Sequence, residues 1–316
     1  MHIWALFHPF LSTSVVRSFL KNCYTELAIS DAELKSYENC YPFIYYIEHG
    51  KKYYLLANQA ADEMKPILLF YGMIQLMKAC LLTVDPTYPA TTTVLAHGVS
   101  TRKRKKRNYQ FLQDEVKIQK NGLLQHFLTF ALHQEVTNER IDMLSLFARI
   151  PEMNAIFLQC NMQKPSEKLR KISDDAYEIT DSLLDHLHMT ENRLKTFLNM
   201  NVHQEKTKNL LRIELNRAIH PTGCLPFFYH SNGEYYIPLK RQLFEPIHEI
   251  VVHYLLLYNL SMICRYETEW WYELFHHFSN YDLPFIQHFL TISETKTPFL
   301  LSQYLAIKKR SFNKLR

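Results

Sequence analysis

The order of hydrophobic and polar residues predicts a chain built mostly from helices. Apolar residues recur at helical spacing after Ser12-Thr13-Ser14, which can cap a first helix. Ser30-Asp31-Ala32-Glu33 matches a capping box and opens a second helix, which we expect to break near Pro42. Lys65-Pro66 begins an almost wholly apolar helix that ends at Asp85-Pro86. Because such a helix must be surrounded by others, we expect it at the centre of the fold.

Helices are also expected later in the chain, together with a few strands. The further helices are predicted at 123–132, on both sides of Pro151, from Thr190, from Pro246 to about Arg265, and at 270–277, 283–291 and 298–307. The segment 109–119 has a strand-like pattern, whereas 168–180 and 210–219 are ambiguous. The clearest strand signal is 227–237, where aromatic and β-branched residues flank Asn232-Gly233, the preferred dipeptide of a type I′ hairpin.

These patterns predict a mainly α (α+β) fold with a small β-hairpin insertion. No internal repeat, low-complexity tract or linker divides the sequence, so we expect a single unit over residues 1–316. A subdivision would give an N-terminal helical part at 1–135, a mixed α/β insertion at 136–244 and a C-terminal helical part at 245–316.

Composition narrows the class and the compartment. Six glycines among 316 residues disfavour folds with many tight turns, such as β-sandwiches and propellers. The six cysteines are scattered, form no CxxC pair and mostly have apolar neighbours, which is typical of reduced cysteines. No basic segment precedes the first apolar residues, so no signal peptide is expected. Both long apolar stretches, 67–84 and 250–264, contain polar residues and are not predicted to span a membrane. We therefore expect a cytoplasmic protein.

The net charge of +5 comes from one short segment. Residues 1–101 carry a net charge of −1, residues 102–120 carry +6, and the remainder is neutral. The basic run consists of Arg102, Lys103, Arg104, Lys105, Lys106 and Arg107. Six adjacent cations would bind nucleic-acid phosphates, a nucleotide polyphosphate or an acidic protein, or they would form a solvated loop. We favour an anionic partner, whose identity the run itself does not specify.

Two apolar helices carry stripes of polar residues. Tyr71, Gln75 and Lys78 follow each other at positions i, i+4 and i+7 and therefore share one helix face. The second stripe consists of Tyr254, Tyr258, Ser261 and Arg265. A lysine among core positions needs a partner, a ligand or a route to solvent. Lys78 either reaches solvent past its own aliphatic stem or lines a polar pocket.

His97 is a further candidate, because His97-Gly98 leads directly into the basic run. An imidazole at this place is suited to serve as a general base or to contact a phosphate. The alternative is a packing or capping histidine. The candidate ligand-binding set is therefore Tyr71, Lys78, His97 and Arg265.

Common cofactor and metal motifs are absent from the sequence. The densest histidine clusters, Asp185-His186-Leu187-His188 and His276-His277, match neither HExxH nor Cys/His ligand spacing, so no metal is expected. The sequence contains no GxxxxGK[ST], GxGxxG or GxSxG motif, which argues against common NTPases, dinucleotide enzymes and α/β-hydrolases. No cofactor is predicted.

Several segments resemble the YaaC-like protein family of Firmicutes. These segments are 38–42 (ENCYP), 69–79 (LFYGMIQLMKA), 88–89 (YP), His97-Gly98, the basic run, 119–123 (QKNGL), 260–266 (LSMICRY) and Trp270. Members of this family are often encoded beside IMP dehydrogenase. The resemblance therefore implies a link to guanine-nucleotide synthesis, with IMP dehydrogenase as a protein partner to consider.

The helix containing Tyr71-Gly72, followed by a loop and His97-Gly98, is also similar to HEPN domains, which are helical bundles that include ribonucleases. Active HEPN enzymes carry an arginine, four to six residues, and then a histidine. The one such spacing here, Arg241 to His248, contains Pro246 and is no more than chance predicts. Catalysis is therefore not implied by this likeness.

Three hypotheses follow. The first is a non-catalytic cytoplasmic regulatory or binding protein that engages an anionic partner, either a nucleotide, RNA or a protein. The second is a metal-independent ribonuclease with His97 as its acid/base. The third is a structural helical protein without a ligand site, in which Lys78 and His97 serve only the fold.

Overall fold

The computed structural model describes residues 3–101, 109–136, 140–205, 208–216, 218–277 and 280–313. Helices make up 59% of the structure and the sheets are small, which confirms the mainly α fold. The chain forms two compact units: the first unit comprises Met1–Met143 and Ile250–Arg316, and the second unit comprises Leu144–Glu249. The basic run 102–107 lies outside the described residues.

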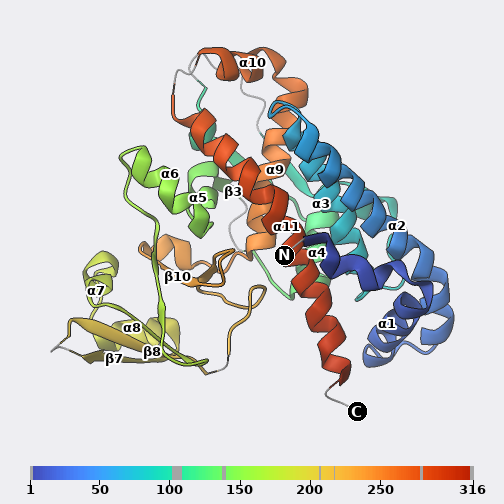
Figure 1. Ribbon diagram of the computed structural model, residues 1–316, viewed down its shortest axis with the longest axis horizontal. Coiled ribbons are helices and arrows are strands. Elements are labelled where there is room, and N and C mark those ends of the chain that lie inside the picture. Colours follow the sequence, from blue (N-terminus) through green and yellow to red (C-terminus); the bar gives the residue numbers. More distant parts are fainter. Residues whose placement is uncertain are drawn as a thin grey trace. The chain divides into compact units, whose positions relative to one another are not determined.

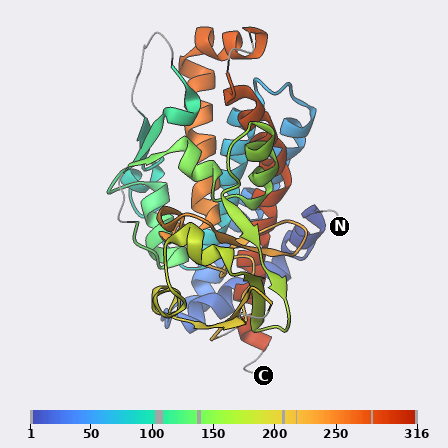
Figure 2. The same ribbon diagram turned by 90° about the vertical axis from the view of Figure 1, so that its left-hand side faces the viewer.

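Long helices form the first unit (Figures 1 and 2). Its helical segments are η1 (Ile3–Leu11), α1 (Thr13–Glu26), α2 (Ala32–Gln59), α3 (Lys65–Leu82), η2 (Thr92–Leu95), η3 (Phe111–Gln113), α4 (Leu123–Phe127), η4 (Leu128–Leu132), α9 (Glu249–Tyr266), α10 (Thr268–His277) and α11 (Asp282–Asn313). Helices α2 and α3 lie very close together, since a methyl group added at Gly72 would come within 2.9 Å of the Tyr54 ring. Helices α9 and α11 are joined by His253 Nδ1 and Ser293 Oγ, which are 2.6 Å apart.

Helix α3 is the buried central element that its apolar composition predicts. Within the described residues it is also the helix whose length and composition would allow it to cross a bilayer, and 67% of it is buried inside the protein. Its neighbours in the first unit cover it almost all round, as an all-round apolar helix requires.

Two predicted helix breaks are wrong. Helix α2 continues through Pro42, and α11 continues through Pro298, so 283–291 and 298–307 belong to one helix. A proline inside a helix costs about 3 kcal/mol through one lost hydrogen bond and a steric clash. Burial of neighbouring side chains offsets this cost: Phe43 in α2 and Leu300 in α11 are completely buried.

A small antiparallel sheet completes the first unit, with strand order β1-β2-β3. Its strands are β1 (Val99–Thr101), β2 (Glu115–Ile118) and β3 (Arg140–Asp142). Strand β2 lies within the segment 109–119, which the sequence predicts to be strand-like. The sheet places β1 directly after His97-Gly98, with Val99 paired to Ile118.

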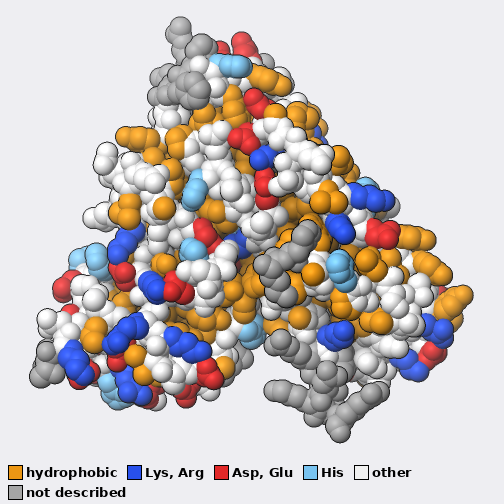
Figure 3. Space-filling model, in the orientation of Figure 1, with side chains coloured by type: hydrophobic (Ala, Val, Ile, Leu, Met, Phe, Trp, Pro, Cys, Tyr) orange, Lys and Arg blue, Asp and Glu red, His pale blue; other side chains and the backbone are white. Residues whose placement is uncertain are grey.

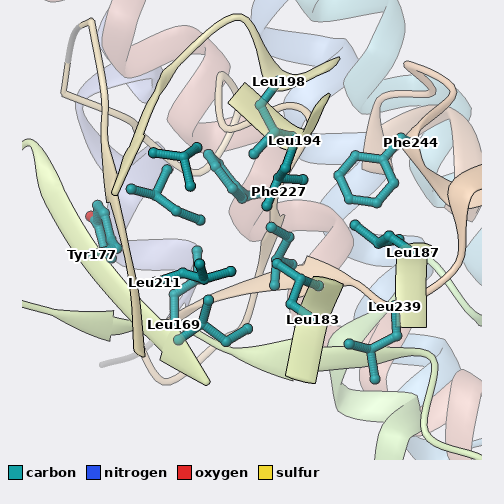
Figure 4. Packing of buried hydrophobic residues seen from close by; sticks show 14 of the residues in the cluster. Leu169, Tyr177, Leu183, Leu187, Leu194, Leu198, Leu211, Phe227, Leu239 and Phe244 are labelled. Carbon is teal, nitrogen blue, oxygen red and sulfur yellow. The ribbon is translucent and has the colours of Figure 1, made fainter. Parts of the chain in front are cut away.

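The second unit is mixed α/β and has its own hydrophobic core (Figure 4). Its elements are α5 (Met143–Phe147), η5 (Pro151–Met153), α6 (Asn154–Gln159), β4 (Ser166–Lys168), β5 (Arg170–Lys171), β6 (Ala176–Thr180), α7 (Ser182–Leu187), α8 (Glu191–Leu198), β7 (Asn201–Glu205), β8 (Leu210–Glu214), β9 (Phe228–Tyr229), β10 (Tyr235–Pro238) and η6 (Arg241–Phe244). Both sheets are antiparallel, with strand orders β4-β10-β9 and β5-β6-β8-β7. The ambiguous segments 168–180 and 210–219 therefore contain strands.

The predicted hairpin forms, but with a different turn. Strands β9 and β10 pair antiparallel, and Tyr235 lies opposite Tyr229. Of the Asn232-Gly233 dipeptide only Gly233 has a positive φ, of 94°, whereas a type I′ turn requires positive φ at both residues. The Gly233 amide donates to the His230 carbonyl at 2.9 Å, so the loop is longer than the type I′ turn that the sequence predicts.

Candidate anion-binding site

The polar face of α3 is half-buried within an otherwise buried helix. Tyr71, Gln75 and Lys78 all keep partial solvent access, whereas most of their neighbours on α3 have none. The ammonium nitrogen of Lys78 lies 5.7 Å from the centroid of the Tyr46 ring, which α2 contributes. Burial lowers the pKa of Lys78. The lysine is therefore a partly desolvated cation in contact with an aromatic ring.

Arg265 reaches the same face from the C-terminal end of α9. Its Nη1 donates a hydrogen bond of 3.2 Å to the hydroxyl of Tyr71, and its Nε donates to the Ser261 carbonyl at 3.0 Å. The guanidinium carbon is 5.9 Å from the centroid of the Tyr71 ring. These contacts join two residues that are 194 positions apart in the sequence.

His97 feels the charge of both cations and is packed among aromatic rings. Its ring centroid is 5.1 Å from that of Phe70, 6.3 Å from that of Tyr71 and 5.8 Å from that of Tyr258. Burial is the main cause that lowers the pKa of His97, and the positive charges of Arg265 and Lys78 lower it further. The Nδ1 atom is buried and has no hydrogen-bond partner in the described part of the chain. The imidazole is therefore neutral near pH 7 and has an unused nitrogen.

The backbone of the His97 loop is held firmly. The Tyr254 hydroxyl donates a hydrogen bond of 2.8 Å to the His97 carbonyl, and the Leu124 amide donates to the same oxygen at 3.3 Å. Gly98 has a φ of 77°, a conformation that favours glycine. Gly122 packs against it so closely that an added methyl group would lie 2.5 Å from the Gly98 Cα atom. The positive φ of Gly98 and the close approach of Gly122 together favour a residue without a side chain directly after His97.

Lys78 and Arg265 give this site its positive charge. Among the described residues, no carboxylate forms an ion pair with Lys78 or Arg265. Burial is the cause of the lowered pKa of Lys78, with no acidic neighbour opposing it. A half-buried pair of cations without counter-charge costs folding free energy, and an anionic ligand would offset that cost.

The structure brings the four predicted site residues to one region of the first unit. Tyr71 contacts both Arg265 and His97, while Lys78 and Arg265 act on His97 through their charges. Lys78 also lies over the Tyr46 ring.

Sequence reasoning missed the contribution of α2. The Tyr53 ring is stacked on the Tyr71 ring, with centroids 6.1 Å apart and planes at 26°. Tyr46 and Tyr53 are seven residues apart and so lie near each other on one side of α2. The seven-residue spacing of the two tyrosines is visible in the sequence and indicates a shared helix face. It does not predict that this face of α2 packs against α3.

Two other clusters of polar side chains connect parts of the fold. His126 Nε2 and Asp85 Oδ2 are 2.8 Å apart, which ties α4 to the end of α3. In the second unit, Arg241 donates to the carbonyl oxygens of residues 187–188, and the His248 ring is buried with Nε2 3.0 Å from the Thr222 carbonyl. The arginine-to-histidine spacing of HEPN ribonucleases thus falls on residues that hold the backbone. No group of three or more potential metal ligands occurs among the residues that the structure describes.

The family assignment rests on most of the chain. The family model described as YaaC-like protein matches residues 8–305. No curated protein and no solved structure matches the chain. The match includes all four site residues and both units. This chain is a member of the YaaC-like protein family.

Proposed function

We propose that this protein is a non-catalytic binding protein whose first unit holds an anionic ligand at Tyr71, Lys78, His97 and Arg265. The observation that carries the proposal is the pair of cations, Lys78 and Arg265, whose charges both act on His97 and which have no described carboxylate partner. Two cations from different helices can bind neighbouring anionic groups of one ligand, because each supplies charge-assisted hydrogen bonds.

The aromatic rings beside the cations favour a nucleotide over a simple phosphate. Tyr53 and Tyr71 are stacked on each other and both are only partly buried. A planar base can stack on such rings, and this interaction is worth about 1–3 kcal/mol per base. The site thus combines positive charge for the phosphate with aromatic side chains for the base. The His49 ring is stacked on Tyr53 with centroids 4.8 Å apart, so a base that stacks there would displace His49. RNA is the alternative anion, and the test below separates the two.

The other two hypotheses are less well supported by the geometry. A ribonuclease would need an acid/base pair on the scissile phosphate, and the HEPN-type spacing lies at Arg241 and His248 rather than at His97. A purely structural role would have Lys78 contact the Tyr46 ring and reach solvent, and it gives no reason for a second cation, Arg265, that also acts on His97. If the wild type has a reproducible nuclease activity that the His97→Ala variant lacks, the ribonuclease hypothesis would be favoured instead.

The proposal is tested by thermal-shift measurements against purine mono- and triphosphates, inorganic phosphate and short RNAs at two salt concentrations. Binding to the folded state raises the unfolding temperature by mass action. We expect a shift with a nucleotide that falls with salt and disappears in Lys78→Met and Arg265→Met. Lys51→Met is the matched control, since Lys51 on α2 is half-buried to a similar degree. A larger shift with RNA than with any nucleotide would identify RNA as the ligand. No shift with any anion would refute the proposal.

A separate proposal concerns the basic run 102–107 and a protein partner. The family resemblance suggests IMP dehydrogenase, and six adjacent cations suit an acidic protein surface. A pull-down should recover IMP dehydrogenase with the wild type and not with a variant in which the run is neutralised. If neither the wild type nor the neutralised variant recovers IMP dehydrogenase, the proposed partner is wrong.

A further inference from the structure

Rings from α2, α3 and α9 form a stacked series that includes the guanidinium group of Arg265. The His49 and Tyr53 rings of α2 are stacked with centroids 4.8 Å apart and planes at 28°. The Tyr53 ring is stacked in turn on the Tyr71 ring of α3, at 6.1 Å. The guanidinium carbon of Arg265 is 5.9 Å from the centroid of the Tyr71 ring and 5.2 Å from that of Tyr266, the last residue of α9. The stacked series therefore has His49 at one end and Tyr266 at the other.

The two ends of the stacked series are exposed, whereas its inner members are half-buried. Tyr266 is 66% exposed, which is the highest value among the large hydrophobic side chains in the part of the chain that the structure describes. Hydrophobic side chains are scattered among polar ones over much of the visible surface (Figure 3), so exposure alone does not mark a binding residue. Tyr266 is distinguished by its contact with a cation of the candidate anion-binding site.

The contacts of Arg265 leave part of its guanidinium edge for an anion. A guanidinium group carries five N–H donors in one plane. Three of them have acceptors among the described residues: Nε donates to the Ser261 carbonyl, Nη1 to the Tyr71 hydroxyl and Nη2 to the Met262 sulfur. Two donors therefore remain for a ligand, next to the exposed ring of Tyr266.

We propose that Tyr266 stacks on the base of the bound nucleotide while Arg265 binds its phosphates. This inference rests on the proposed function and names the residue that recognises the base. A base can stack on the exposed Tyr266 ring while Arg265 keeps its own contact with that ring. At Tyr53, by contrast, a base would have to displace His49.

The geometry favours a purine nucleoside di- or triphosphate. Stacked rings have centroids at least about 4.5 Å apart, and the guanidinium carbon is 5.2 Å from the Tyr266 centroid. A base and a guanidinium group on opposite faces of the ring are therefore about 10 Å apart. A ribose with two or three phosphates can span this distance, whereas a free phosphate cannot contact both groups. A two-ring purine covers more of the tyrosine face than a pyrimidine, so ATP and GTP should bind more tightly than UTP.

Calorimetric titration with ATP, GTP and inorganic tripolyphosphate tests the role of Tyr266, because tripolyphosphate carries the phosphates without a base. Tyr266→Ala should raise the Kd of the purine nucleotide about 5- to 150-fold and leave the Kd of tripolyphosphate unchanged. Tyr266→Phe keeps the ring and should bind like the wild type. His49→Ala, at the other exposed end of the stacked series, and Tyr272→Ala, at an exposed tyrosine of α10, are controls that should change neither Kd.

The outcomes separate the role of Tyr266 from the proposed function. If the wild type binds both ligands and Tyr266→Ala binds the nucleotide with an unchanged Kd, the anion site stands and the role of Tyr266 is wrong. An equal rise in Kd for nucleotide and tripolyphosphate would also overturn that role, because Tyr266 would then act only through Arg265. A nucleotide Kd that His49→Ala raises and Tyr266→Ala does not would place the base at the other end. If neither ligand binds the wild type, nucleotide binding and the role of Tyr266 are both wrong.

Discussion

Replacing Lys78 with methionine should weaken anion binding and stabilise the fold at the same time. Methionine keeps the length and apolar stem of the lysine, so packing against the Tyr46 ring is retained while the ammonium group is removed. Because no described carboxylate offsets this partly desolvated charge, its removal should raise the free energy of unfolding by about 1 kcal/mol. In a chain of 316 residues that corresponds to a rise of about 1.5 °C in Tm.

The effect on binding is opposite in sign and larger. A hydrogen bond to a charged group contributes about 1.5–3 kcal/mol, so losing the Lys78 contact should raise Kd by about 10- to 150-fold. Calorimetry of the nucleotide found by the thermal-shift screen measures Kd, and thermal unfolding without ligand measures stability. If Lys78→Met unfolds at a higher temperature but binds with an unchanged Kd, the lysine is not a ligand contact and the reasoning fails. Lys51→Met should alter neither quantity.

Three further predictions concern the scaffold of the site. Gly122→Ala should cost more free energy of unfolding than Gly233→Ala in urea denaturation, because both positions have positive φ but only Gly122 has backbone atoms within 2.5 Å of the added methyl group. The lowered pKa of His97 means that the unfolded chain binds its proton more readily, so wild-type stability should fall below pH 6.5 more steeply than that of His97→Gln. Asp282→Ala should destabilise the protein by about 2–4 kcal/mol in the same urea assay, because its buried carboxylate accepts hydrogen bonds from the amides of residues 111–112.

Local pattern was sufficient for the elements whose signal is strong along the chain. Helix α3 could be predicted because its apolar run is bounded by Lys65-Pro66 and Asp85-Pro86. The breaks expected at Pro42 and Pro298 could not be corrected from sequence, because they depend on the burial of other side chains against distant helices. Tertiary packing here outweighs a local penalty.

In the candidate site, too, the sequence predicts the local pattern but not the contacts between distant helices. The spacing of Tyr71 and Lys78 and the position of Arg265 identified the polar faces of two helices before their contact was known. That Arg265 bonds to Tyr71 depends on how α9 packs against α3, which no local pattern contains. The stacking of Tyr53 on Tyr71 was missed for the same reason, since it requires the close approach of α2 and α3.

The most direct test of the binding site is isothermal titration of a purine nucleoside triphosphate into the wild-type protein at low and high salt. The account predicts one saturable site per chain whose Kd rises with salt, because the ligand replaces counter-ions at Lys78 and Arg265. The same titration of the Lys78→Met, Arg265→Met double variant should show no binding. Binding that is undiminished in the double variant, or absent from the wild type for every anion in the screen, would contradict the account.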